Sequence, residues 1–269
     1  MPIAHLEDRA VIAVTGPQAR AFLQGLITND VEKLEPGKGL YAALLTPQGK
    51  ILFDFFLTEG DGAILIDCAA PARDVLLKRL SMYKLRAKVA LEARDQLAVL
   101  AEWEGAAARS AISYDDPRLG TLGRRAFIAR AEMRSDVLDA KVYHQHRLDL
   151  GVPEGADFGS DRIFALDADL DELHAVDFTK GCYVGQELTA RMKHRGTARK
   201  RLLAFASSDA VASGDAVKAG DKEIGEIAST YGGQGFALIR LDRLDEAGDA
   251  VLTAGGAAAK LIKPSWLFA

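Results

Sequence analysis

Cysteine is scarce in this sequence of 269 residues, which contains only Cys68 and Cys182. The two lie far apart and form no CxxC pair, so their spacing predicts neither a disulfide framework nor a self-contained zinc or four-cysteine cluster site. Any metal cluster bound here would therefore need ligands from a partner protein.

Long apolar runs and several common motifs are also missing. No run of about 18 apolar residues occurs, and residues 1–8 lack the basic and apolar regions of a signal peptide. This predicts a cytoplasmic protein with no membrane contact. There is no GxGxxG motif after a strand, no Walker loop, no GxSxG and no HExxH, which argues against the common cofactor-binding and hydrolase classes. A net charge of −4 argues against non-specific nucleic-acid binding by the whole surface.

The stretch least explained by core packing is residues 177–187, DFTKGCYVGQE. Its cysteine, Cys182, follows Lys180 and lies between two glycines. A nearby cation favours the thiolate, and glycines allow a ligand to approach the backbone closely. The alternative is a tight turn in which the cysteine is a small buried hydrophobic residue. The residues alone leave these two interpretations about equally open.

Residues 180–187, KGCYVGQE, resemble the signature octapeptide of the YgfZ family. These are folate-binding proteins related to the T-protein, the aminomethyltransferase of the glycine cleavage system. Further similarity lies in residues 14–17, 22–31 and 147–153, and in a β-rich C-terminal third. The resemblance implies a reactive thiol at Cys182 with Lys180 as its charge partner. The remaining motif residues would support this site: Gly181, Tyr183, Gly185, Gln186 and Glu187.

The function implied by the resemblance is support of iron–sulfur cluster assembly or repair. Its partners would be iron–sulfur assembly proteins or client enzymes, including those that thiomethylate tRNA. The implied cofactor is tetrahydrofolate or a derivative, bound in a central channel. Asp149 matches the pterin-binding position, because a carboxylate can accept hydrogen bonds from the pterin N–H donors. The other expected folate-binding residues are Arg147, Asn29 and Asp54.

The same resemblance tests the alternative of a folate-dependent one-carbon transferase. In the transferases, the strand matching residues 51–57 carries two adjacent carboxylates, and the first falls here on Phe53. Proton transfer at a folate nitrogen needs a positioned acid or base, which a phenyl ring cannot supply. This departure argues against aminomethyl transfer but not against folate binding.

A basic run follows the motif at residues 191–201. With a helix starting near Tyr183, Arg191 and Arg195 would follow Glu187 at i+4 steps, close to the thiol. We expect Arg191, Lys193 and Arg195 to form an anion-binding patch. A second alternative function is an RNA or protein adaptor that uses this basic face, although the absence of interleaved aromatic residues argues against base stacking.

Hydrophobic periodicity predicts an α+β fold. Residues 1–95 contain a strand at 11–14, a helix capped by Thr15, a hairpin, a further strand, a helix from Pro71 with Val75 on its inward side, and a strand at 88–91. We interpret this as a ferredoxin-like, split βαβ unit. The family resemblance implies that residues 96–200 form a second such half and that the two halves enclose the channel. In that half we expect a helix over 136–148, capped by Ser135 and stopped at Gly151. Residues 201–269 predict a small antiparallel β-barrel with five strands, at 201–205, 216–218, 222–227, 235–240 and 259–262.

Overall fold

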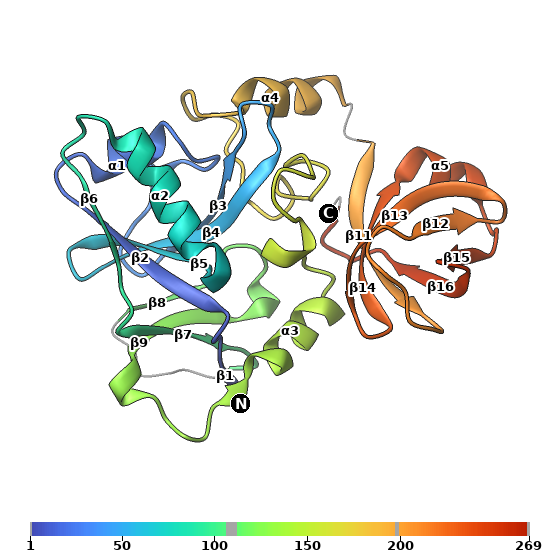
Figure 1. Ribbon diagram of the computed structural model, residues 1–269, viewed down its shortest axis with the longest axis horizontal. Coiled ribbons are helices and arrows are strands. Elements are labelled where there is room, and N and C mark those ends of the chain that lie inside the picture. Colours follow the sequence, from blue (N-terminus) through green and yellow to red (C-terminus); the bar gives the residue numbers. More distant parts are fainter. Residues whose placement is uncertain (1, 106–111, 197–198, 268–269) are drawn as a thin grey trace. The chain divides into compact units, whose positions relative to one another are not determined.

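The structure is a computed structural model, and it describes residues 2–105, 112–196 and 199–267 (Figure 1). The chain divides into two compact units, each assembled from separate segments. The first unit comprises Met1–Leu45, Leu52–His146 and Leu173–Val184. The second comprises Thr46–Ile51, Arg147–Glu172 and Gly185–Ala269. The motif around Cys182 thus lies at the end of a short segment that returns to the first unit.

One sheet of the first unit has the strand order β3-β4-β5-β2-β6. Its elements are β2 (Arg9–Thr15), α1 (Ala19–Gln24), β3 (Gly39–Leu45), β4 (Ile51–Gly60), β5 (Ala63–Ala69), α2 (Arg73–Lys84) and β6 (Ala90–Ala93). Three consecutive strands separate the two helices, one more than the split βαβ order contains. The core of this layer is almost wholly apolar and includes Leu76 and Leu80, which attach α2 to the sheet.

Two local predictions in this layer were wrong. Thr15 does not cap α1, because β2 continues through Thr15 and the helix begins only at Ala19, after Gln18. Val75 was expected to point inward from α2, yet it is 58% exposed, because only the face of Leu76 and Leu80 meets the sheet.

The second sheet of the first unit has the order β10-β1-β7-β9-β8. Its strands are β1 (Ile3–His5), β7 (Leu97–Glu102), β8 (Ile112–Asp115), β9 (Arg124–Ala129) and β10 (Leu138–Asp139). Helix α3 (Ala140–Asp149) follows β10 directly, so Ser135 is not its cap. The predicted helix stop is confirmed: Gly151 has a φ of 68°, which favours glycine, and its N–H donates to the Leu148 carbonyl.

Buried charges join the two sheets of the first unit. Asp67 on β5 accepts hydrogen bonds from Arg9 at 2.6 Å and from Arg125 on β9 at 2.8 Å. Arg125 also reaches Asp116 at 3.2 Å, and its guanidinium carbon lies 3.8 Å from the centre of the Phe56 ring. All these side chains are buried, so each charge depends on its partner for solvation.

The barrel of the second unit is closed, in the order β11-β14-β13-β12-β15-β16. Its elements are β11 (Lys200–Ser207), β12 (Ala216–Ala219), β13 (Lys222–Tyr231), β14 (Gln234–Arg240), α5 (Leu241–Ala247), β15 (Leu252–Ala254) and β16 (Ala257–Ile262). The five predicted strands are present, while β15 and α5 were not predicted. Short 3-10 turns occur at Val31–Lys33, Ala70–Ala72, Gly120–Leu122, Arg130–Glu132 and Gly155–Asp157.

Candidate functional site

The two cysteines occupy opposite environments. Cys182 is exposed on the loop that precedes helix α4 (Gln186–Arg195). Cys68 is buried in β5, its sulfur 3.6 Å from the Ala10 carbonyl oxygen, and burial raises its thiol pKa to about 12. Cys182 is therefore accessible, as the reactive thiol implied by the resemblance would need to be, whereas Cys68 is protected.

Lys180 anchors the Cys182 loop. Its Nζ donates hydrogen bonds to the carbonyl oxygens of Gln24 at 2.8 Å, Ile27 at 2.6 Å and Asn29 at 2.8 Å. An ammonium group has three donors, so these contacts use all of them. Burial lowers the pKa of Lys180 to about 8. The structure thus gives Lys180 a structural role, and its action as the charge partner of the thiol stays a prediction.

Asp177 shapes the start of the same loop. One carboxylate oxygen accepts from the Thr179 N–H and hydroxyl, each at 2.7 Å, and from the Lys180 N–H at 3.0 Å. The other forms an ion pair with Lys33. Burial alone would raise the pKa of Asp177, but these hydrogen bonds outweigh it and lower the pKa to about 2. The carboxylate therefore stays ionised and keeps the turn closed at neutral pH.

The segment 22–31 forms the platform for this loop. The Thr28 hydroxyl donates to the Ala175 carbonyl at 2.6 Å, and the Thr28 carbonyl accepts from the Asp177 N–H at 3.0 Å. The Asn29 side-chain amide donates to the carbonyls of Tyr41 and His174, each at 2.8 Å. Both of its amide protons are therefore used. The role of Asn29 in folate binding stays a prediction.

The other residues of the motif differ in backbone conformation and in exposure. Gly185 has a φ of 83° and precedes α4, a conformation that favours glycine. The helix therefore begins at Gln186, not near Tyr183, which is buried. A Cβ at Gly181 would meet no atom within 4 Å, so a larger residue at this position would cause no steric clash at Cβ. Glu187 is exposed and lies 3.9 Å from Arg191, the expected i+4 pair.

The proposed folate-binding side chains are divided between the two units. In the first, Asp54 is buried and accepts a hydrogen bond from the Tyr41 hydroxyl at 2.8 Å. Its neighbour Phe53 packs against the apolar core cluster. In the second, Arg147 is buried and donates to Asp157 at 2.7 Å, and its contact with folate stays a prediction. Asp149 ends α3 and is exposed.

The basic run is less uniform than its sequence indicates. Arg191, Lys193 and Arg195 are exposed on α4, and Lys193 donates to Asp171 at 3.1 Å. Arg201, by contrast, is buried and lies 3.4 Å from Asp169, so it does not belong to a solvent-facing basic surface. Residues 197–198 of the run lie outside the described residues.

Two buried acids beside Arg201 were missed by the sequence reasoning. Asp169 is fully buried with a φ of 61°, and burial raises its pKa well above the usual value. Burial also raises the pKa of Asp167 to about 6, against the opposing effect of Lys200 and Arg201. The only sequence signal was the acidic character of the long connection after α3.

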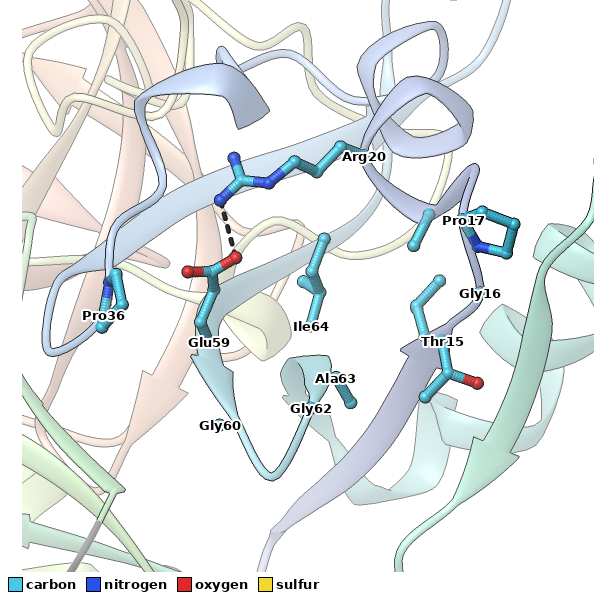
Figure 2. Close-up of a pocket in the computed structure, with 12 residues that line it drawn as sticks. Thr15, Gly16, Pro17, Arg20, Pro36, Glu59, Gly60, Gly62, Ala63 and Ile64 are labelled. Atoms are coloured by element: carbon cyan, nitrogen blue, oxygen red, sulfur yellow. Dashed lines mark hydrogen bonds and ion pairs between the residues drawn. The ribbon is translucent and has the colours of Figure 1, made fainter.

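A separate pocket of about 530 Å³ lies in the first unit (Figure 2). Buried Val14 and Ile64 line it, together with the Arg20–Glu59 ion pair of 2.6 Å. Cys182 is not among its lining residues. The sequence did not predict this pocket.

Within the described residues, no group of three or more His, Cys, Asp or Glu side chains could hold a metal ion. Over the same part of the chain, none of the helices has the length and apolar character needed to cross a bilayer.

Comparisons with known proteins match both parts of this architecture. Residues 5–113 match the GCVT N-terminal domain, and residues 199–269 match the CAF17 C-terminal beta-barrel domain. The crystal structure of the glycine cleavage system aminomethyltransferase T from Bartonella henselae superposes with a TM-score of 0.74 over 98% of this chain and 85% of that one. At 16% identity this shows the fold alone. The chain is thus a protein of the aminomethyltransferase-like α+β fold with a CAF17-type barrel, which confirms the predicted fold class.

Sequence relatives narrow the family. The chain is 33% identical to the mouse and 32% identical to the human mitochondrial iron–sulfur cluster assembly factor IBA57, covering 78% of each. It is 34% identical to the Neurospora crassa IBA57 homolog but spans only 52% of its length. The chain belongs to the IBA57 family. The names of these relatives carry the word mitochondrial, and the expectation of a cytoplasmic location stays a prediction.

Proposed function

We propose that this chain acts in iron–sulfur cluster assembly, with the thiol of Cys182 contacting the cluster as cargo. The observation that carries the proposal is an exposed cysteine on a loop whose base is fixed by three hydrogen bonds from Lys180. The names of its relatives, iron–sulfur cluster assembly factors, support the same role.

The chemistry of the loop limits how a cluster would be held. A thiolate is the form of cysteine that binds iron, and Cys182 offers one such ligand. Cys68 is too deeply buried to supply a second. The remaining ligands would come from a partner protein. Asp177 and Lys180 would fix the direction from which the thiol meets that partner, because they tie the loop to residues 24–33.

Complementation of a deletion strain tests the proposal. Cys182→Ala and Cys182→Ser should fail to restore iron–sulfur enzyme activity, while Cys68→Ala, the matched control, should restore it. Purified Cys182→Ser should unfold at the wild-type temperature, because the side chain is exposed. Full complementation by both Cys182 variants would exclude a role for the thiol.

A second candidate function is binding of tetrahydrofolate or a derivative. The observation that favours it is the exposed carboxylate of Asp149, at the position that resembles the pterin ligand of the transferases. Asp149 is the residue to test, because it is exposed at the end of α3. Calorimetry with tetrahydrofolate should show binding to wild type that Asp149→Asn weakens and Glu132→Gln, an exposed control, does not. Absence of binding at millimolar folate would remove this candidate.

Finer features of the proposed function follow from the same site. Aminomethyl transfer is not expected. The phenyl ring of Phe53, which packs against the core cluster, occupies the position that carries a carboxylate in the transferases, and it cannot transfer a proton. A coupled aminomethyltransferase assay tests this directly. If enzymes that thiomethylate tRNA are clients of this chain, they should lose activity in the strain complemented with Cys182→Ala. The amount of thiomethylated tRNA in the complemented strains measures this loss.

A further inference from the structure

A second surface of the first unit combines exposed apolar side chains with unneutralised positive charge. Residues 78–88 contain five cations and no acid in a chain of net charge −4. The cations are Lys78, Arg79, Lys84, Arg86 and Lys88. No ion pair joins any of them to an acid among the residues that the structure describes. Elsewhere cations are commonly paired, as Arg73 is with Asp74 at 2.9 Å.

Three apolar side chains stand among these cations. Val75 is 58% exposed, Met82 63% and Leu85 89%. On α2, Val75, Lys78 and Met82 follow at i, i+3 and i+7, so they share one face, opposite the buried Leu76 and Leu80. We define the α2 face as the surface formed by these three residues together with Leu85, Arg86 and Lys88.

Leu85 has the least favourable conformation on the α2 face. Its backbone has φ 44° and ψ −109°, outside the regions that non-glycine residues normally adopt. Such strained conformations cluster at binding and active sites. Burial gives no compensation here, because the side chain is almost fully in solvent.

Lys88, at one end of the α2 face, lies beside Gly16, a residue that lines the 530 Å³ pocket. The Lys88 N–H donates to the side chain of Gln18 at 2.6 Å. A Cβ on Gly16, which lines the pocket, would overlap the Lys88 carbonyl oxygen. Figure 2 shows Thr15, Gly16 and Pro17 forming one wall of that pocket.

We propose that the α2 face docks an acidic segment of a partner protein, which places an apolar side chain against Met82 and Leu85 or in the adjoining pocket. The cations complement the acids of the segment and speed its encounter, while the apolar groups supply the buried centre of the contact. Methionine and arginine are enriched at the centre of protein interfaces, whereas lysines such as Lys78 and Lys88 suit the polar rim. RNA fits less well, because the aromatic residue of α2, Tyr83, packs partly against the core and offers no stacking surface. This proposal does not depend on the function of Cys182.

Fluorescence anisotropy with the full chain tests the proposal, using a labelled synthetic peptide of alternating glutamate and leucine as the probe. The informative variant is Leu85→Gly, because glycine accepts the positive φ and should keep or raise the unfolding temperature while removing the side chain. We expect Leu85→Gly, and separately the double change Lys78→Glu and Arg86→Glu, to weaken peptide binding by on the order of tenfold or more. Val251→Ser and the double change Lys218→Glu and Lys260→Glu, which alter exposed barrel residues, are the matched controls and should leave binding unchanged.

Control ligands separate the proposal from its competitors. A peptide with serine in place of leucine, and one with glutamine in place of glutamate, should each bind more weakly. Poly(U) RNA and phosphatidylglycerol vesicles should not displace the peptide. The proposal is overturned if no acidic peptide binds, if Leu85→Gly binds like wild type, or if RNA or vesicles bind more tightly and compete.

Discussion

Lys180 donates a hydrogen bond of 2.8 Å from its Nζ to the backbone carbonyl of Asn29, 151 residues earlier in the chain. This contact joins the two sequence segments that carry most of the family resemblance, 22–31 and 180–187. The lysine of the motif thus holds the loop on which Cys182 is exposed.

Replacing Lys180 should therefore separate loop anchoring from thiol chemistry. Lys180→Met keeps the aliphatic stem but leaves three carbonyls without their donor, which should lower the free energy of unfolding by on the order of 2–4 kcal/mol. Cys182→Ser should leave stability unchanged. Urea unfolding of both variants measures the difference, with Lys218→Met as the control that removes an exposed cation from the barrel. Equal stability of Lys180→Met and wild type would contradict an anchoring role.

The environments of the two thiols predict a large difference in reactivity. Under native conditions iodoacetamide should label Cys182, while Cys68, buried and with a raised pKa, should react only after unfolding. Mass spectrometry of the single-cysteine variants Cys68→Ala and Cys182→Ala resolves the two sites. Labelling of native Cys68 at a rate comparable with Cys182 would show that β5 opens readily.

The fold was predictable where patterns are local. The alternating and apolar runs of the barrel predicted five of its strands, but Leu252–Ala254 has only three residues and gave no periodic signal. The prediction that Thr15 caps a helix failed because of tertiary pairing. β2 pairs with β6 through Thr15, so this residue belongs to the strand and cannot act as a helix cap.

The candidate site was predictable only in part. The motif and its similarity to a family indicated Cys182, and the structure confirms its exposure. The partners of Lys180 could not be predicted, because they are backbone carbonyls and carry no residue-specific signal. For the same reason the backbone partners of the Asn29 amide could not be predicted.

The buried charges of Arg9, Asp67 and Arg125 lead to a stability prediction. Asp67→Ala would leave two arginines buried without their shared carboxylate, so the free energy of unfolding should fall by about 3–5 kcal/mol. Asp95→Ala removes an exposed partner of Arg73 and should cost under about 1 kcal/mol. Urea unfolding of both variants measures the contrast. A small effect of Asp67→Ala would mean that water or another group solvates the arginines.

The pH dependence of stability should reveal Asp167. Burial raises its folded-state pKa to about 6 from the ordinary value of 3.8, so between these values the folded state binds more protons than the unfolded state. The contribution of this group therefore favours folding at low pH and is lost as pH rises through about 6.

Asp167→Asn removes the buried charge and should raise the free energy of unfolding at pH 7.5 by on the order of 2 kcal/mol. The difference between variant and wild type should shrink toward zero below pH 4, where Asp167 is protonated in both states. Asp161→Asn, an exposed neighbour in the same connection, should show no such trend. Thermal unfolding of the three proteins across this pH range measures the effect, and a stabilisation by Asp167→Asn that is equal at pH 4 and pH 7.5 would exclude titration of Asp167 as its cause.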